Sequence, residues 1–372
     1  MIGEDDVKNL QSYLIFGCIL VGGTIFAHSA EKSSCRLVQK LNYLLMFLIL
    51  LLPLAFRGET VGIDTVTYYK WFDSASKFYD GEKFFLYWEP GFALLIKLLM
   101  LLSNNSTFVM FVFDFFILYF IVSRLWEYKG RMPFSEGIFL FITLFYLFCF
   151  NLTRQMLALA LVFWATRYLE KKKYLWFLLF VVLASTIHAT SVVCSLILLV
   201  YMFLPKAAVY KKEIEFVLLV GLSVIVMLLA LLFNDNSISV IDRIQHYINK
   251  YLIIGNVNLG FMYVVRFVAI SLTFCLIYRI SNRNNDQVKI NNFLYFIGTV
   301  LALVGSFFEF VERLGLFFLV YVCVLFPIIF NSDYFNKRSK ILLKWGVYSL
   351  CMLLYLIALV GNSQGQMPYV LL

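Results

Sequence analysis

Long apolar stretches recur along almost the whole of this 372-residue chain, separated by short loops that carry most of its Lys and Arg residues. About 20 apolar residues are enough for an α-helix to cross a membrane, because each residue adds about 1.5 Å to the helix. Only 14% of the residues are charged, whereas soluble chains carry about 25%. The sequence therefore predicts an all-α polytopic integral membrane protein, with residues 1–372 forming a single transmembrane bundle.

We predict about twelve transmembrane helices, which follow the apolar stretches from end to end. They are expected at residues 12–29, 40–56, 107–124, 134–150, 153–169, 173–187, 190–204, 214–233, 260–280, 291–309, 313–330 and 341–360. The loops near 32–40, 124–131, 167–173, 206–212, 279–289 and 337–344 hold 20 of the 31 Lys and Arg residues. Since basic loops stay on the cytoplasmic side, the other loops are predicted to face outward. The net charge of +9 is then a consequence of topology, and nucleic acid is not expected as a partner.

Two segments are predicted to lie on the outer face. The first, 57–106, includes the short apolar stretch 90–103, which Lys97 interrupts. A Lys in the middle of a spanning helix costs about 2.5–3.5 kcal/mol, so we expect an interfacial or re-entrant helix there. If 90–103 did cross, residues 1–86 would change sides, and charge counting does not decide between the two. The second segment, 234–258, has Ile and Leu at helical spacing and predicts an amphipathic surface helix.

Three apolar stretches, 134–169, 173–204 and 291–330, are too long for one crossing and have basic loops at both ends. Each is therefore predicted to be a hairpin that turns at the outer face. The turns are expected where polar residues interrupt the apolar run, at 151–155, 185–191 and 309–313. They would bring an arginine, a histidine and a Glu/Arg cluster to one side of the membrane at similar depth.

Three arginines are the first candidates for a binding site. Arg154 and Arg313 lie at the first and third of these turns, and Arg266 lies about 9 Å into the span that starts near residue 260. Arginines at membrane depth are costly and usually functional. A guanidinium can bind two phosphate oxygens at once. Three arginines facing one outer cavity would therefore suit a pyrophosphate. The alternative is a structural salt bridge, for instance between Arg313 and Glu309.

Asp64 and Glu89 are candidate general bases, because they lie among the Tyr and Trp residues of the first outer segment, as in many sugar-binding grooves. A carboxylate there can deprotonate an attacking sugar hydroxyl, and His188 is the competing base. The alternatives are solvated carboxylates and a histidine that is hydrogen-bonded in a tight turn. Motifs for nucleotide hydrolysis, zinc peptidases, serine hydrolases and dinucleotide binding are missing from the sequence. We therefore predict no metal and no cofactor, and any glycosyl donor has to be lipid-linked.

A pattern in the first outer segment resembles the first external loop of the EpsG-like polysaccharide polymerases. It is Gly62-Ile63-Asp64-Thr65-Val66-Thr67-Tyr68-Tyr69, followed by Glu89-Pro90-Gly91-Phe92. Residues 153–158 and 184–191 are similar to two later motifs of that family. These proteins are Wzy-type polymerases of O-antigen, capsule and exopolysaccharide assembly. The external loop also looks like those of the GT-C glycosyltransferases, which is an analogy of fold.

The resemblance implies a multi-pass protein of the bacterial inner membrane with its active site on the periplasmic face. Such enzymes transfer a growing glycan from undecaprenyl pyrophosphate to a lipid-linked repeat unit, so the expected partners are undecaprenyl-pyrophosphate-linked oligosaccharides and membrane lipid. A chain-length regulator is left open. The family's site residues fall here on Asp64, Tyr68, Glu89, Gly91, Arg154, Gln155 and His188. The alternative functions are a flippase or transporter for lipid-linked oligosaccharides, and an O-antigen ligase that differs only in its acceptor lipid.

Overall fold

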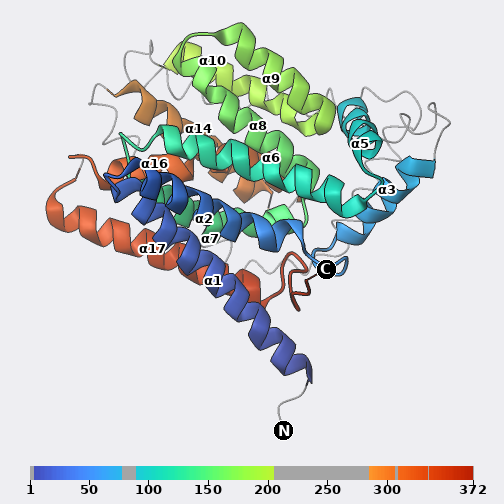
Figure 1. Ribbon diagram of the computed structural model, residues 1–372. Helices are drawn as coiled ribbons and strands as arrows, with labels where there is room; N and C mark the ends of the chain where they lie inside the picture. The colour runs from blue at the N-terminus through green and yellow to red at the C-terminus, as the bar shows by residue number, and fades with distance from the viewer. Residues whose placement is uncertain (1–3, 78–88, 205–284, 306–308, 334, 372) are drawn as a thin grey trace. The chain divides into compact units, whose positions relative to one another are not determined.

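The computed structural model describes residues 4–77, 89–204, 285–305, 309–333 and 335–371. In these ranges the regular structure is helical (Figure 1), apart from one isolated bridge between Arg57 and Leu371. The helices are α1 (Glu4–Lys32), α2 (Arg36–Ala55), α3 (Thr65–Lys77), α5 (Pro90–Leu102), α6 (Ser106–Glu127), α7 (Phe134–Leu144), the 3-10 helix η1 (Tyr146–Phe150), α8 (Thr153–Glu170), α9 (Tyr174–Ile187), the 3-10 helix η2 (Ala189–Cys194), α10 (Ser195–Phe203), α14 (Asp286–Val304), α15 (Glu309–Leu319), α16 (Val322–Phe330) and α17 (Lys337–Val360). The all-α class is confirmed for this part of the chain.

Five of the described helices are long and apolar enough to cross a membrane: α1 from Asn9 onward, α2, α6, α14 and α17. A sixth span is reached if Phe310–Leu319 and Val322–Phe330 count as one. These helices indicate a multi-pass membrane protein. The expected total of about twelve spans is not shown, since 214–233 and 260–280 lie outside the described residues. Other predicted spans fold as shorter helices such as α7 and α9, because an apolar sequence suits a short helix buried in a bundle as well as a span.

Helices end at two of the three predicted turns. The pair α7 and η1 ends at Phe150 just before α8 begins, and α9 ends at Ile187. The third prediction, a turn at 309–313, is wrong, because these residues are helical and begin α15. Instead, α14 ends at Gly305, where a Cβ would lie 2.5 Å from the backbone nitrogen of Glu312. Gly305, the residue after α14, thus allows the end of α14 to approach the first turn of α15 closely.

The first outer segment contains two short helices. One is α5, thirteen residues long, which extends only about 20 Å and is shorter than the hydrocarbon core. An interfacial or re-entrant helix at 90–103 agrees with this length. The other is α3, which we did not predict from the sequence. Its signal was present, since Thr65, Tyr68, Tyr69 and Phe72 are spaced as one helix face and are all buried.

The chain divides into two compact units, one of Met1–Ala189 with Cys323–Leu372 and one of Thr190–Val322. In the second unit, α14 packs against α15 and α10. A Cβ on Gly298 would lie 2.7 Å from the backbone nitrogen of Leu319, so α14 and α15 approach each other closely. A single bundle over the whole chain stays a prediction. The candidate site lies in the first unit, which the following paragraphs describe.

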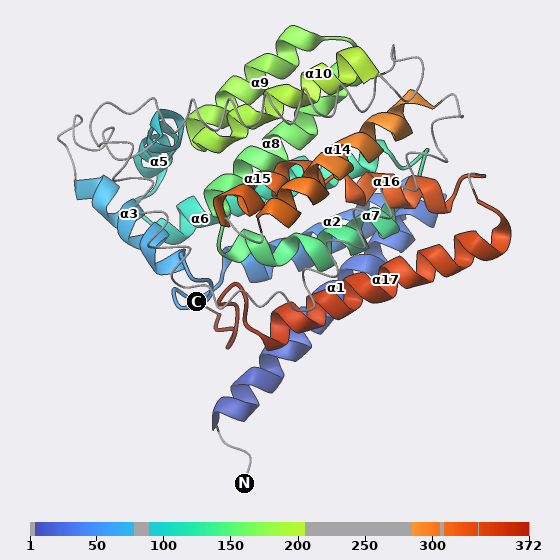
Figure 2. The same ribbon diagram turned by 180° about the vertical axis from the view of Figure 1, so that it is seen from behind.

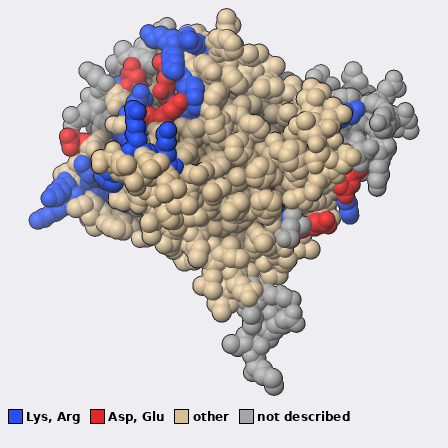
Figure 3. Space-filling view, viewed as in Figure 1, with Lys and Arg blue, Asp and Glu red and all other residues tan. Residues whose placement is uncertain are grey.

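The basic loops of the first unit gather at one end of its helices. Arg124 near the end of α6 forms an ion pair with Glu170 at the end of α8, and Lys344 near the start of α17 pairs with Glu136 of α7 at 2.5 Å. Most of the Lys and Arg side chains visible in Figure 3 lie in this region, and the middle of that face carries almost no charge. We call this the basic end, and the opposite end, where α3 and α8 begin and α9 finishes, the site end. Which end faces the cytoplasm stays a prediction.

A fully buried ion pair joins α2 to α6 at the site end. The guanidinium of Arg57 donates to a carboxylate oxygen of Asp114 at 2.7 Å, and both side chains are 0% exposed. The same guanidinium donates to the carbonyl of Leu54 at 2.5 Å. The pair therefore carries no net charge into the bundle, and Arg57 also closes the last turn of α2.

Arg57 also reaches the starts of two further helices. It donates to the hydroxyl of Thr65 at 3.3 Å and to the hydroxyl of Thr153 at 3.4 Å. Thr65 follows Asp64 in the chain, and Thr153 precedes Arg154. One guanidinium thus holds the backbone next to two of the predicted site residues.

We predict that Asp114→Leu strongly destabilises the protein. Removing one partner of a buried ion pair leaves the other charge without compensation, which costs about 3–5 kcal/mol. The double variant Arg57→Met/Asp114→Leu should recover much of this loss, because neither charge is then left buried. Unfolding in detergent micelles measures both. An Asp114→Leu variant as stable as the wild type would contradict this account of the pair.

Candidate functional site

Arg154, Glu89 and His188 meet at the site end. Nη1 of Arg154 donates to Oε2 of Glu89 at 2.6 Å, and Nδ1 of His188 lies 3.6 Å from the other carboxylate oxygen, Oε1. The three side chains are 23%, 22% and 20% exposed. They come from the first turn of α8, the residue before α5 and the residue after α9. The structure thus brings together three of the predicted catalytic residues, whose roles stay predictions.

Gly91 allows α5 to approach α9. A Cβ at position 91 would lie 2.1 Å from Oγ1 and 2.9 Å from the carbonyl oxygen of Thr186. Any larger residue would therefore have to push the two helices apart. Pro90 occupies the first turn of α5, where its missing N–H is not needed. This tight contact places Glu89, directly before Pro90, beside His188.

Aromatic rings surround the guanidinium of Arg154. Its Cζ lies 5.3 Å from the ring centre of Trp71 and 5.3 Å from that of Phe92. A guanidinium within about 6 Å of a ring centre is attracted to the π electrons. The hydroxyl of Tyr68 accepts a hydrogen bond from the backbone N–H of Arg154 at 3.4 Å. Tyr68 and Trp71, two of the aromatic residues that the sequence places around the candidate carboxylates, therefore both lie at the candidate site.

Asp64 lies in the turn before α3, half-buried, and its backbone is held in place. Its N–H donates to Oδ1 of Asn151 at 3.0 Å. Two residues earlier, Gly62 has a φ of +97°, and a Cβ there would lie 2.2 Å from the carbonyl oxygen of Phe150. Only glycine fits this turn. The carbonyl of Asp64 accepts from the N–H of Tyr68, so the two side chains lie about one helical turn apart on one face of α3.

The segment after α17 packs over this turn. We found no signal for this packing in the sequence. We call residues 361–371 the C-terminal strap; Figures 1 and 2 show the chain ending beside the start of α3. The N–H of Gly62 donates to the carbonyl of Gly365 at 2.7 Å. Nδ2 of Asn151 donates to Oε1 of Gln364 at 3.2 Å. Asn151 therefore connects the backbone of Asp64 to the strap.

For the remaining predicted site residues, Gln155, Arg313 and Arg266, a place in this cluster stays a prediction. Gln155 is 3% exposed, and it faces a different side of α8 from Arg154, because adjacent helical residues point about 100° apart. Arg313 belongs to the second unit, so a cavity shared with Arg154 stays a prediction. Arg266 and the amphipathic segment 234–258 lie outside the described residues. No group of three or more His, Cys, Asp or Glu side chains that could hold a metal occurs within the described ranges, and metal independence stays a prediction.

The electrostatics of the cluster keep Glu89 ionised. Burial raises its pKa, but the contact with His188 and the positive charge of Arg154 outweigh burial and lower the pKa from 4.5 to about 2. Burial raises the pKa of the Tyr68 hydroxyl. A carboxylate with a pKa near 2 is a weak proton acceptor at neutral pH. In this state Glu89 is the counter-ion of Arg154, and its role as a base stays a prediction.

We predict that the stabilisation contributed by Glu89 depends on pH only in acid. A lowered pKa in the folded state stabilises the protein at every pH above the unfolded value, and this contribution is lost as the pH falls through the folded value. The difference in stability between the wild type and Glu89→Gln should thus be constant from pH 7 to about 5. It should shrink between pH 4.5 and about 2. Thermal unfolding in detergent at stepped pH measures this difference, and a constant difference down to pH 2 would rule out the ion pair as its source.

Comparison with known proteins identifies the family of this chain. The family model of the EpsG family matches residues 40–371. A search of curated proteins and a search of solved structures each found no match. Because the match covers most of the chain, the protein belongs to the EpsG family, which is linked to exopolysaccharide synthesis.

Proposed function

We propose that this EpsG-family membrane protein is a polysaccharide repeat-unit polymerase. It transfers a growing glycan from undecaprenyl pyrophosphate to the sugar of a second lipid-linked repeat unit. The reaction takes place at the site end, which faces the periplasm of a bacterial inner membrane. Family membership supports a role in polysaccharide assembly, and the arrangement around Arg154 supports the chemistry.

The observation that carries the proposal is an arginine at a helix start that already binds an anion. Arg154 lies in the first turn of α8 and holds the carboxylate of Glu89 at 2.6 Å. The unpaired N–H groups of a helix start also favour negative charge. A pyrophosphate has several acceptor oxygens for the planar guanidinium of Arg154, so it can replace the single carboxylate of Glu89.

The transfer makes one bond and breaks one. The acceptor hydroxyl oxygen attacks the anomeric carbon of the donor glycan and loses its proton to a base. The bond between the anomeric carbon and the pyrophosphate oxygen breaks, and its electron pair leaves with undecaprenyl pyrophosphate. Arg154 stabilises the charge that develops on this leaving group. The partly exposed ring of Trp71, which packs against the buried ring of Tyr68, provides a surface on which a sugar ring can lie.

Asp64 is the base that the geometry favours. Glu89 is engaged by Arg154 and has a pKa of about 2, which leaves it a poor proton acceptor in the resting state. Asp64 lies one turn before Tyr68, and the hydroxyl of Tyr68 contacts the backbone of Arg154. Its backbone is held by Asn151 at the same end of the bundle.

We predict that Arg154→Ala abolishes nearly all polymerisation, whereas Arg154→Lys keeps part of it. Lys retains the charge but loses the planar fork that binds two oxygens. A charge-assisted hydrogen bond is worth about 1.5–3 kcal/mol, so losing one should slow transfer roughly ten- to a hundredfold. The measurement is a gel of the surface polysaccharide from a strain that carries only the variant. A ladder shows polymerisation, and a single-repeat band shows that polymerisation is lost.

Arg131→Ala is the matched control, since Arg131 is 59% exposed and lies at the basic end. It should give the wild-type ladder. Both Arg154 variants have to reach the membrane in normal amount for the comparison to hold. Wild-type polymerisation by Arg154→Ala would disprove the leaving-group role. Complete loss of the surface polysaccharide, in place of a single-repeat band, would instead favour a flippase or a ligase.

We also predict that Asp64→Asn is more harmful than Glu89→Gln. Losing a general base costs about 10²- to 10⁴-fold in rate, whereas Glu89→Gln removes a counter-ion and leaves Arg154 in place. Turnover of purified enzyme with lipid-linked repeat units distinguishes the two. Equal or reversed losses would move the role of base from Asp64 to Glu89 and His188.

A further inference from the structure

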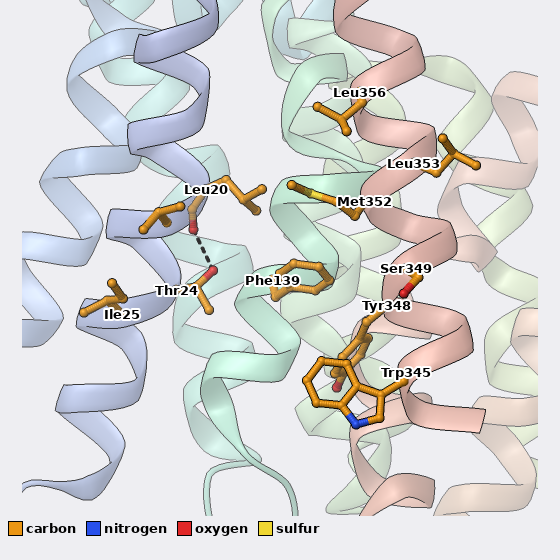
Figure 4. A pocket seen from close by; sticks show the side chains of 11 residues that line it. Leu20, Thr24, Ile25, Phe139, Trp345, Tyr348, Ser349, Met352, Leu353 and Leu356 are labelled. Carbon is orange, nitrogen blue, oxygen red and sulfur yellow. Dashed lines mark hydrogen bonds between the residues drawn. The ribbon is translucent and has the colours of Figure 1, made fainter. Parts of the chain in front are cut away.

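An apolar groove runs between α1 and α17 of the first unit, far from Arg154. It has a volume of about 590 Å³ and its floor includes Phe139 of α7 (Figure 4). Two of the hydroxyls on its walls are already bonded inside the protein. That of Thr24 donates to the carbonyl of Leu20 at 2.7 Å, and that of Tyr348 donates to Glu136 at 2.6 Å. The groove therefore offers hydrocarbon contact and few polar groups.

The groove is about one leaflet deep. It follows α17 from Trp345 to Leu356, a distance of about 16 Å, which is roughly half the hydrocarbon thickness of a bilayer. Toward the site end the two helices touch, since the hydroxyl of Tyr355 donates to the carbonyl of Phe16 at 3.2 Å. At the other limit Trp345 is 64% exposed. The groove is thus closed where Tyr355 and Phe16 meet, at its limit toward the site end, and exposed at Trp345, toward the basic end.

This shape does not suit a spanning helix of another protein. Such a helix is about 10–12 Å wide, so the length that would lie along the groove occupies roughly 1,500 Å³, and its other half would meet the closed end. A single hydrocarbon chain needs far less width. The occupant that fits is the acyl chain of a lipid whose headgroup lies at the basic end.

Positive charges lie where that headgroup would be. Lys32 lies on the same face of α1 as the residues that line the groove, one or two turns closer to the basic end. Arg338 lies in the same way on α17. Both residues are exposed. Lys344, which lies nearby on α17, is instead paired with Glu136. Two basic side chains at the mouth of an apolar groove match an anionic headgroup.

We propose that this groove binds one acyl chain of an anionic glycerophospholipid, with the phosphate between Lys32 and Arg338. The lipid fills the space between α1 and α17 that would otherwise be a void in the bundle. It is a structural ligand and not the substrate. A polyprenyl pyrophosphate that reaches Arg154 has its headgroup at the opposite end.

Native mass spectrometry in detergent micelles tests this proposal. The purified protein is mixed with equal amounts of phosphatidylglycerol and phosphatidylcholine that have the same acyl chains. Two basic residues near the headgroup should give about ten- to thirtyfold preferential retention of one phosphatidylglycerol. Lys32→Gln/Arg338→Gln should remove the preference. The matched pair Lys171→Gln/Lys173→Gln, exposed at the basic end but away from the groove, should keep it.

A second variant tests the groove itself. Leu353→Trp places a larger side chain on its wall and should lose the bound lipid. Leu179→Trp, at a position on α9 that is 56% exposed and does not line the groove, should not. Both should polymerise normally, because the site lies at the other end. Equal retention of the two lipids, or unchanged binding by Leu353→Trp, would overturn the proposal. Displacement of phosphatidylglycerol by undecaprenyl phosphate at equal concentration would do so too, and would make the groove a substrate site.

Discussion

The buried ion pair of Arg57 and Asp114 is the interaction on which the arrangement of the site depends. Both side chains are fully buried, so either charge alone would be strongly unfavourable inside a membrane protein. Paired, they are neutral, and the remaining donors of the guanidinium are free to bind other elements. They do so at Thr65 and Thr153, which begin α3 and α8. The relative position of α3 and α8, and so of the residues around Arg154, follows from a single planar group that can bond in several directions at once.

The site itself is assembled from segments that are distant in the sequence. Gln364 and Asn151 are 213 residues apart, and Glu89 and Arg154 are 65 apart. Backbone contacts that tolerate only glycine hold two of these segments. Gly91 lets α5 touch α9, and Gly62 lets the turn before Asp64 touch Phe150. Because the strap follows the last helix, the turn that carries Asp64 acquires its final hydrogen bonds only when the end of α17 is in place. The position of Asp64, the proposed base, therefore depends on the packing of the whole first unit.

Most helices were predictable from the sequence, because apolar stretches and polar interruptions are local signals. The cluster of Glu89, Arg154 and His188 was also predictable in part, since each residue lies at a polar interruption or in a motif that resembles the family. Three features were missed for physical reasons. The pairing of Arg57 with Asp114 joins residues 57 positions apart, and no local pattern specifies such a partner. The strap binds mainly through backbone carbonyls, which every residue has. The charged residues at 309–313 suggested a turn but begin α15, because acidic side chains are favoured at helix starts as well as in turns.

The pair of Glu89 and Arg154 gives the proposed site a means of selecting its donor. In the resting state the carboxylate occupies the guanidinium, and a ligand has to replace a charge-assisted hydrogen bond worth about 1.5–3 kcal/mol. A neutral sugar hydroxyl forms a weaker hydrogen bond with Arg154 than the carboxylate does, so it leaves the pair intact. A pyrophosphate brings more charge and more acceptor oxygens, so it can displace Glu89 and still gain from the start of α8. Once displaced, Glu89 loses the charge that helped to lower its pKa, while burial, which raises it, persists. The carboxylate then still lies beside His188, and Asp64 remains the proposed base, so the donor replaces the counter-ion of Arg154 without removing the proposed proton acceptor.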